Sequence, residues 1–319
     1  MDTILITGAA GNLGSRLARR LLAEPVKQRL MIHRTPLPED LAAIGAGRIE
    51  VVTADLARPE TLIAPLQGVD CVVHFAGVLF QPRPATFLSE TNTRWFSNLL
   101  DAALAARVPR VVLISFPQVE GPTTPEHPAT GRLDYAPVWI HARTRLEEER
   151  LLFEKTRGTS TTPVVLRSAT VYGRGILMIE AARWLSRRHL LAVWRKPTWY
   201  HFIQTADFLD AVTASALKPG ISGIYQLGDD APMTIQDFLD RAAHIWGNSP
   251  PWRMPWWMIL TAAAASEAFA MTFRTRSPLT RDFVRLGRVD HCCDTRRMRA
   301  ELLPQLKYPT FEQGKRTLL

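Results

Sequence analysis

The chain has 319 residues, 46% of them hydrophobic, which is enough to bury a sizeable core without disulfide or metal staples. It carries 33 arginines and 6 lysines against 30 acidic residues, so its net charge is +9 and its isoelectric point is near 9.9. This balance favours anionic ligands such as nucleotides or phosphates. Nucleic acid is not expected as a partner, because the arginines are scattered and no basic run is interleaved with aromatic residues.

The cysteines, the N-terminal segment and the most apolar segment indicate the cellular compartment. Cys71, Cys292 and Cys293 form neither a disulfide framework nor a CxxC pattern, so no metal site is expected and a reducing cytoplasm is predicted. The N-terminal "MDTILITGAA" lacks the regions of a signal peptide. The most apolar segment, Met254 to Phe273, is interrupted by a serine and a glutamate, which argues against a spanning helix. It is interpreted first as an amphipathic helix of a substrate lobe, and second as a membrane-surface contact.

The first half of the chain alternates short apolar runs with helical patterns, which is typical of a parallel sheet covered by helices on both faces. The apolar runs lie at residues 3–7, 29–33, 49–53, 70–75, 110–115 and 163–167. Apolar residues with helical spacing fall at residues 12–23, 59–66, 89–106 and 137–156. Two further short strands are predicted at 200–205 and 223–228, with a helix at 206–218 between them.

The alternation ends after Arg167. Helices are predicted near residues 176–188, 234–246, 255–272 and 278–285, among loops rich in proline and tryptophan. These pieces predict a smaller, mainly helical lobe that closes over the strand ends of the sheet. Ligands of open α/β sheets bind at those ends, where the strand order reverses.

The segment "ITGAAGNLGSRL" places Gly8, Gly11 and Gly14 directly after the first predicted strand and at the start of the first helix. Glycine backbones can turn tightly, approach a pyrophosphate closely and leave its charge at the helix N-terminus. The motif and its context predict a Rossmann-type doubly wound α/β fold with a dinucleotide site. The other candidate binding residues of this turn are Ala10, Asn12 and Leu13.

The end of the second predicted strand distinguishes NAD from NADP, because an acidic residue there accepts from the 2′-hydroxyl of NAD. This chain has His33 and Arg34 instead, which offer donors and positive charge. NADP(H) is therefore predicted over NAD(H), with Arg34 at the 2′-phosphate; an ordinary solvated arginine is the alternative. Asp55 is placed to accept from the adenine amino group, or alternatively to cap a helix, and Leu56 follows it in the same candidate site.

With these residues the chain resembles the extended short-chain dehydrogenase/reductases, the NAD(P)-dependent epimerase and dehydratase group, over nearly its whole length. The resemblance rests on "TGAAGNLG" (7–14), "HFAG" (74–77), "LRSATVYGRG" (166–175) and "HFIQTADFLDA" (201–211). The predicted nucleotide-binding domain covers residues 1–167 and about 199–228, and the predicted substrate lobe covers about 168–198 and 229–319.

The resemblance implies further cofactor contacts and a homodimer. Phe75, Ala76 and Gly77 are expected to pass the cofactor by backbone contacts, and Asn92 is expected on a helix that lines the site. Many relatives pair through the helices at residues 92–103 and 137–149, so a dimer is implied by the resemblance alone.

The chain departs from this family at all three catalytic positions. The family uses a Ser or Thr, a Tyr and a Lys, the last two spaced as YxxxK, and no YxxxK occurs here. Aligning the frame through the flanking proline and glutamate puts His141 at the Tyr position and Arg145 at the Lys position. Phe116 stands where the hydroxyl belongs. Ser115 lies one residue too early, and both it and Arg145 remain candidates for catalysis and for cofactor binding.

The replacements can be judged by their chemistry. Histidine titrates near neutral pH and can act as acid or base without a lysine to tune it. Arg145 can donate to ribose hydroxyls, although a planar guanidinium does not substitute neutrally for an ammonium group. Losing a donor to a developing oxyanion, as at Phe116, commonly costs about a hundred- to a thousandfold in rate. Tyr135 is a rescue candidate, but Trp139 occupies its +4 position. The alternative is a helix that has lost its catalytic duty.

Substitutions on the substrate side argue against a standard sugar nucleotide. Ser168 and Thr170 stand where the family usually has a proline and an asparagine. Phe116 favours an apolar group beside the nicotinamide. The tryptophans of the predicted lobe indicate an apolar or aromatic ligand, with ordinary packing as the alternative.

The leading hypothesis is an NADP-binding oxidoreductase or epimerase-like enzyme that acts on a small, fairly apolar carbonyl or hydroxyl substrate, with His141 moving the proton. The main alternative is a catalytically silent protein that uses NADP as a structural or sensing ligand. A third hypothesis is peripheral membrane association through Met254 to Phe273.

Overall fold

A parallel β-sheet forms the centre of the molecule. The structure is a computed structural model that describes residues 2–44, 47–78, 81–275, 277 and 279–319. Within this part of the chain the sheet has seven strands in the order β11-β6-β5-β4-β1-β2-β3, and every pairing is parallel. The strands are β1 (Thr3–Thr7), β2 (Lys27–Ile32), β3 (Ile49–Thr53), β4 (Cys71–His74), β5 (Arg110–Ser115), β6 (Thr162–Ser168) and β11 (Gly223–Leu227). The strand order reverses between β1 and β4, which is where open sheets bind ligands.

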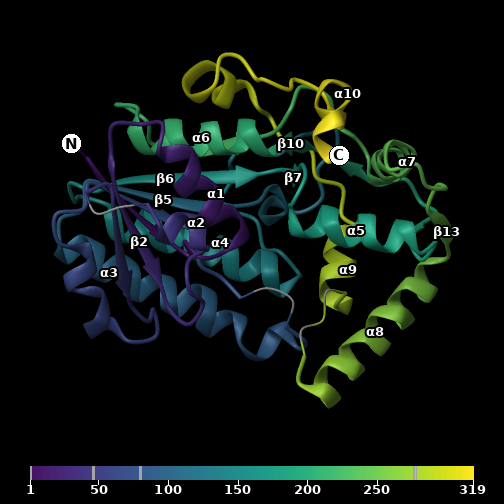
Figure 1. Ribbon diagram of the computed structural model, residues 1–319, viewed down its shortest axis with the longest axis horizontal. Coiled ribbons are helices and arrows are strands. Elements are labelled where there is room, and N and C mark those ends of the chain that lie inside the picture. Colours follow the sequence, from purple (N-terminus) through teal and green to yellow (C-terminus); the bar gives the residue numbers. More distant parts are fainter. Residues whose placement is uncertain (1, 45–46, 79–80, 276, 278) are drawn as a thin grey trace.

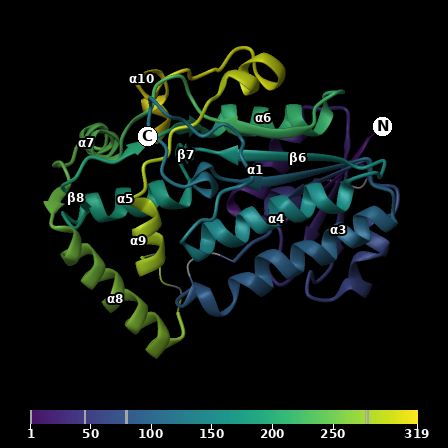
Figure 2. The ribbon, with the colours of Figure 1, turned by 180° about the vertical axis from the view of Figure 1, so that it is seen from behind.

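Helices cover both faces of this sheet. One face carries α1 (Asn12–Leu21) and α6 (Thr205–Leu217), and the other carries α3 (Trp95–Ala105) and α4 (Ile140–Thr156), as Figures 1 and 2 show from opposite sides. Strand β1 shows why the apolar runs are continuous. Ile4 and Ile6 pack on the α1 and α6 side while Leu5 packs on the α3 and α4 side, and all three are fully buried.

The doubly wound parallel sheet predicted from the sequence is confirmed, and most predicted elements agree to within two or three residues. The helix predicted at residues 59–66 is wrong. Two 3₁₀ turns stand there, η1 (Pro59–Leu62) and η2 (Ala64–Leu66), because Pro65 lacks the N–H that a continuous α-helix needs. The helix predicted at 89–106 begins as a π-helix, η4 (Ser89–Arg94), before α3.

The rest of the chain forms short strand pairs and helices. The pairs are β7 (Thr170–Tyr172) with β10 (Phe202–Gln204), β9 (Trp199–Tyr200) with β12 (Met233–Thr234), and β8 (Ala192–Trp194) with β13 (Trp252–Met254). The helices are α5 (Leu177–Arg187), α7 (Ile235–Ile245), α8 (Trp256–Phe273), α9 (Arg281–Gly287) and α10 (Phe311–Gly314). The predicted start of α9 at residue 278 lies outside the described residues. Smaller elements are α2 (Glu39–Ala42), η3 (Pro84–Thr86), η5 (Pro117–Glu120), η6 (Met298–Leu302) and η7 (Lys315–Leu318).

The C-terminal segment returns to the sheet. Met298, Leu302 and Leu306 join the apolar cluster that α1 and α6 form over one face. A separate cluster holds Trp194, Ile259 and Val284 from β8, α8 and α9. The domain boundaries expected from the sequence stay a prediction, with the addition that part of the expected lobe packs on the sheet.

Candidate active site

The turn between β1 and α1 is shaped by backbone contacts that exclude side chains. Gly8 has a φ of 67°, and a Cβ on it would approach the backbone nitrogen of Ala76 to 2.9 Å. A Cβ on Gly14 would overlap the carbonyl oxygen of Gly8, and the Gly11 N–H donates to that same oxygen over 2.8 Å. The three glycines are therefore required by close approach within the turn and against the segment after β4.

The start of α1 can take an anion. Its N-cap is Gly11, and no side chain of the described residues caps it, so its first amides keep their hydrogen-bonding capacity. Its first turn holds no acidic residue. Because unpaired amides and the helix dipole both favour a phosphate, these residues fit the pyrophosphate of a dinucleotide.

A hydroxyl ties this turn to the strand beside it. Thr7 Oγ1 accepts from the backbone N–H groups of Phe75 and Ala76, each over 3.2 Å, and donates to His74 Nδ1 over 2.8 Å. Burial, with a contribution from the charge of Arg145, lowers the pKa of His74 to about 3, so its ring is neutral and can accept. The predicted cofactor contacts Phe75 to Gly77 are thus fixed across Gly8. Thr7 and His74 lie in the motifs at residues 7–14 and 74–77 but were not among the predicted site residues, although both end strands at the predicted site.

The expected adenosine end lies beyond β2 and β3. His33 Nε2 stands 3.6 Å from Asp55 Oδ2, and Arg34 is exposed beside it. Asp55 Oδ1 accepts from the Ala57 N–H over 3.0 Å, which leaves Oδ2 facing His33, and the N-cap of the helical turn that follows is Arg58 rather than Asp55. Leu56 contributes its carbonyl oxygen to the Asn98 side chain over 2.9 Å. Adenine and 2′-phosphate recognition by these residues stays a prediction.

His141 is held by a residue from the other end of the chain. Helix α4 begins at Ile140, because Trp139 is extended, and this places His141 in the first turn. His141 Nδ1 lies 2.5 Å from Asp282 Oδ2, on the first turn of α9. Both side chains are mostly buried, with 16% and 20% exposure. When Nδ1 donates to this carboxylate, Nε2 is left for another partner. No local sequence signal marks Asp282, which stands 141 residues away.

Arg145 lies one turn further along α4, between the cofactor segment and a buried acid. Its Nη1 is 2.7 Å from Glu148 Oε2, and its Nη2 would be 3.7 Å from a Cβ on Gly77. Burial raises the pKa of Glu148 to about 7, and the charge of Arg145 opposes part of that rise. The guanidinium therefore stands beside Gly77. A contact between Arg145 and the ribose of the cofactor stays a prediction.

Asn92 connects the π-helix η4 to α4. Its Nδ2 donates to Thr144 Oγ1 over 3.1 Å, and Thr144 Oγ1 donates to the carbonyl oxygen of Ile140 over 3.0 Å. Asn92 is 5% exposed. Asn92 therefore helps to fix the first turn of α4, and its expected place on a helix that lines the cofactor site stays a prediction.

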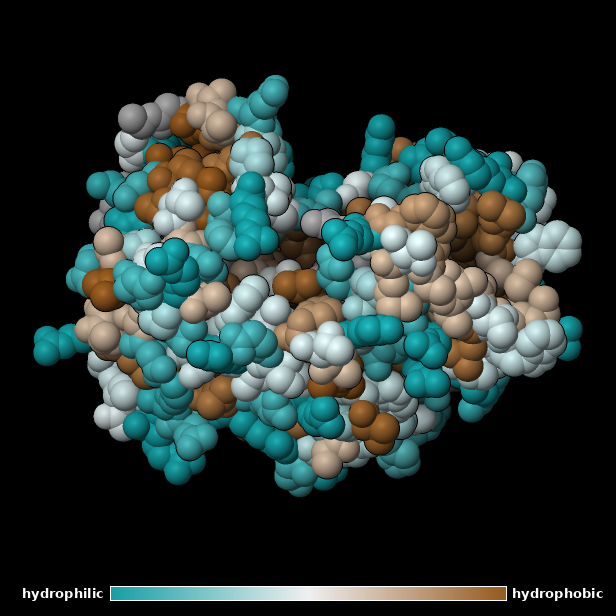
Figure 3. Space-filling view, turned by 90° about the horizontal axis from the view of Figure 1, so that it is seen from below, coloured by the Kyte–Doolittle hydropathy of each residue, from teal (hydrophilic) through white to brown (hydrophobic). Residues whose placement is uncertain are grey.

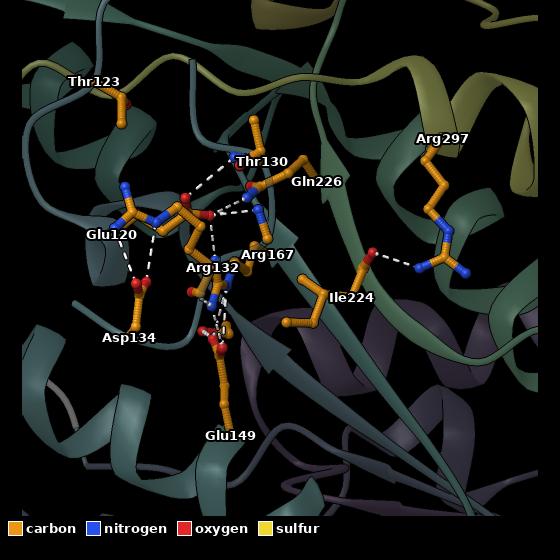
Figure 4. Close-up of polar contacts among 12 residues, drawn as sticks. Glu120, Thr123, Thr130, Arg132, Asp134, Glu149, Arg167, Ile224, Gln226 and Arg297 are labelled. Carbon is orange, nitrogen blue, oxygen red and sulfur yellow. Dashed lines mark hydrogen bonds and ion pairs between the residues drawn. The ribbon is translucent and has the colours of Figure 1, made fainter. Parts of the chain in front are cut away.

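Ser115 belongs to a buried ionic network rather than to an open site. Its hydroxyl donates to Glu149, whose carboxylate is 2.5 Å from Arg167 Nη2. Figure 4 shows Glu149 reaching up from α4 to Arg167, while Glu120 and Gln226 converge on the same region. Arg167 and Glu149 are fully buried, so this pairing compensates charges that would otherwise be very costly. The proton of Ser115 is committed to Glu149, and its predicted role in catalysis or cofactor binding stays a prediction.

Phe116 and Tyr135 lie beyond that network. Phe116 is half-buried and extended directly after β5. The Tyr135 ring lies against Gly121, where a Cβ would come within 2.6 Å of Cε1, and its carbonyl oxygen accepts from Arg150 over 2.8 Å. The contacts found for the described residues join Tyr135 to Gly121 and Arg150, and they do not bring it to His141.

The two predicted substrate residues have local partners. Ser168 Oγ donates to the Ala169 carbonyl oxygen over 2.9 Å. Thr170 Oγ1 lies 3.2 Å from His291 Nε2, and His291 Nδ1 lies 3.1 Å from the Val289 carbonyl oxygen. Because a carbonyl only accepts, Nδ1 carries the proton and Thr170 donates to Nε2. Burial lowers the pKa of His291 to about 4, which keeps this ring neutral. Substrate contact by Ser168 and Thr170 stays a prediction.

Comparisons with known proteins agree with this geometry. A model of the NAD dependent epimerase/dehydratase family matches residues 4–228. The chain is 25% identical to a ceramide reductase of Caulobacter vibrioides, across 86% of this chain and 80% of that protein. It is 24% identical to a 2-alkyl-3-oxoalkanoate reductase of Shewanella oneidensis, across 88% and 76%. Its fold is similar to that of a dTDP-glucose 4,6-dehydratase from Bacillus anthracis in complex with NAD, with a TM-score of 0.77 and 16% identity over 100% and 96% of the two chains.

Proposed function

The chain belongs to the NAD-dependent epimerase/dehydratase family and is similar to two reductases, and from this premise we propose that it is an oxidoreductase with a non-standard active site. It acts on a small, fairly apolar carbonyl or hydroxyl compound with NADP(H), and His141 moves the proton. The observation that carries this proposal is the pairing of His141 with Asp282 beside Arg145 and the cofactor segment.

Proton movement can be assigned to one ring nitrogen. The bound cofactor supplies or takes a hydride. Asp282 accepts from His141 Nδ1–H, which orients the ring and leaves Nε2 for the substrate. Nε2 then donates to, or accepts from, the substrate oxygen. Arg145, beside Gly77, donates to ribose hydroxyls and brings positive charge near the reacting centre.

Two features support the cofactor and substrate preferences. Arg34 is exposed at the end of β2 and has no structural task among the described contacts, which suits a 2′-phosphate partner. Phe116 puts an apolar ring at the end of β5, where relatives have a hydroxyl. The names of the two reductases support a carbonyl as the oxidised form of the substrate.

A non-catalytic NADP-binding protein is the second candidate, and one observation favours it. Ser115, the hydroxyl nearest to the missing catalytic position, is bonded to Glu149 inside the buried network. Ser115 therefore does not offer its proton to a substrate oxygen, and His141 would have to stabilise the developing charge on that oxygen without help from β5.

Two measurements test the proposal. Fluorescence titration with NADPH and NADH comes first, and a tenfold or better preference for NADH would overturn the NADP assignment. The protein is then incubated with NADPH and a panel of aldehydes and ketones, alongside His141→Ala and the control His127→Ala, whose ring is exposed. Turnover lost in His141→Ala and kept in His127→Ala supports the proposal. Turnover kept in both removes His141 from the mechanism, and tight NADPH binding without any turnover favours the second candidate.

A further inference from the structure

Helix α8 is apolar around its whole circumference, yet one face lies at the surface. Trp257, Phe269 and Phe273 are 64%, 59% and 62% exposed. The other large apolar residues of α8 that are exposed are Met258 and Met271. Its buried stripe consists of Ile259, Ala263, Glu267 and Ala270, so the single charged residue of the helix points inward. A helix that is apolar all round is normally covered by something.

The charge of Glu267 is used inside the protein. Its two carboxylate oxygens accept from the backbone N–H and from Nε of Arg281, over 2.8 and 2.7 Å. The exposed face therefore carries aromatic rings, methionines, alanines and threonines without a charged side chain among the described residues of α8. Figure 3 shows tan and brown side chains over the right-hand part of the lower face, where α8 lies in Figure 1.

The surroundings of α8 are strongly basic. Between Trp252 and Val289 the sequence has six arginines and two acidic residues. Both acids are engaged, Glu267 with Arg281 and Asp282 with His141, and of the other arginines Arg253 is paired with Asp240. Arg274 and Arg285 are exposed near the ends of α8 and α9. An apolar face flanked by arginines matches an anionic lipid surface, which offers both acyl chains and negative headgroups.

We propose that α8 lies in the plane of a membrane surface containing anionic lipids, with Trp257, Phe269 and Phe273 inserted below the headgroups. None of the helices in the described parts of the chain is both long and apolar enough to cross a bilayer, which agrees with an in-plane position. Helix α8 shares an apolar cluster with Val284 of α9, the helix that carries Asp282. Helix α8 therefore packs on α9, and α9 carries the aspartate that pairs with His141.

Vesicle flotation of the full chain tests this proposal. Vesicles of equal parts phosphatidylglycerol and phosphatidylcholine are compared with pure phosphatidylcholine, and binding is expected to the mixed vesicles and to weaken with added salt. Phe269→Asp together with Phe273→Asp is expected to reduce the partition coefficient by at least about tenfold, since two apolar rings that enter the acyl layer are replaced by charged groups. The control is Ile63→Asp, an apolar residue of 61% exposure between η1 and η2, which should leave binding unchanged.

Sedimentation of the same variants resolves the competing occupant. Failure of the parent protein to float with either vesicle overturns the proposal. So does a parent dimer that the two aspartates dissociate without any vesicle binding, because α8 would then contact a second copy. Circular dichroism and NADPH titration confirm that the variants are folded. No carbonyl substrate is used, so the result is independent of the role proposed for His141.

Discussion

The glycine turn and the start of α4 face the same expected cofactor, yet they are built differently. The turn is held by backbone approaches, in which Gly8 meets Ala76 and Gly14 meets the carbonyl oxygen of Gly8. The start of α4 presents separate side chains, and each of them has its own side-chain partner: His141 pairs with Asp282 of α9, and Arg145 pairs with Glu148 further along α4.

This difference explains which half of the site is unchanged from the family pattern. A side chain added in the turn would collide with backbone, so the motif stays whole or binding is lost. A side chain on the first turn of α4 can be replaced without moving the helix, because the buried pairing of Glu149 with Arg167 and the Asn92 contact fix α4 independently. Chemistry can therefore change at His141 while cofactor binding persists.

The largest expected effect breaks the turn itself. Gly14→Ala must displace Gly8, and we expect it to cost about 3 kcal/mol of stability through overpacking. Each pyrophosphate hydrogen bond lost with the displaced turn weakens NADPH binding by about ten- to a hundredfold. The control is Gly68→Ala, where φ is 66° and a Cβ meets open space. Isothermal titration should find its affinity unchanged. Parent-like NADPH affinity in Gly14→Ala would contradict the comparison.

The next largest effect concerns the proton. His141→Ala should lower kcat by about a hundred- to ten-thousandfold, as expected for a general acid or base. Asp282→Asn should cost about tenfold, because the amide oxygen can still accept from Nδ1–H while the stabilising charge is gone.

A comparison of activity with stability separates this positioning role from a structural one. Asp282→Asn should lower kcat while the free energy of unfolding stays close to that of the parent protein, since the amide oxygen still accepts from Nδ1–H. Asp134→Asn, an exposed residue paired with Arg132, should change neither quantity. A parent-like kcat in Asp282→Asn, with a stability loss instead, would show that Asp282 only joins α9 to α4.

Much of the fold could be predicted from the sequence because local patterns decide it. Strands β1, β3 and β5 have the predicted bounds, since each is a short, mostly apolar run; β1 and β5 are mostly buried, whereas β3 lies at the edge of the sheet and is largely exposed. The helix expected at 59–66 failed on a local feature, the second proline, that outweighs helical spacing. The glycine turn was predictable because its context is sequential.

The catalytic contacts could not be predicted in the same way. Asp282 reaches His141 across 141 residues, and nothing near either residue indicates the other. The partner of Ser115 was equally unpredictable, because the direction of its hydroxyl depends on Glu149 and Arg167, which come from α4 and β6. Side-chain partners that meet only in the folded state leave no periodic signal in the sequence.

A smaller effect tests the acid beside Arg145. The pKa of Glu148 is raised by burial from an ordinary 4.5 to about 7, so the folded protein holds a proton there that the unfolded chain has released. The free energy of unfolding therefore falls as pH rises from 4.5 to 7 and is level above, by about 3 kcal/mol at most. Glu148→Gln should abolish this part of the slope.

Denaturant unfolding at a series of pH values measures this slope. The gain of Glu148→Gln over the parent protein should grow between pH 5 and pH 7 and then stay constant. Glu154→Gln, an exposed residue of the same helix, should follow the parent curve. A gain that does not depend on pH would mean that Glu148 is charged throughout and pairs fully with Arg145.

The smallest expected effect falls on the adenosine end of the cofactor site, where we expect a side chain, and not the backbone, to bind the cofactor. Arg34→Ala should raise the Kd for NADPH by about tenfold, the value of one charge-assisted hydrogen bond, and leave the Kd for NADH unchanged. Arg34 is exposed, so this change should not alter stability, and the loss reports the ligand alone. Arg58→Ala, an exposed arginine paired with Glu60, should affect neither cofactor. Equal weakening of both cofactors would place Arg34 at the pyrophosphate, whereas no weakening would make it a solvated surface residue. Only a selective loss of NADPH affinity shows that the choice of cofactor depends on a replaceable side chain, just as proton transfer depends on a replaceable side chain of α4.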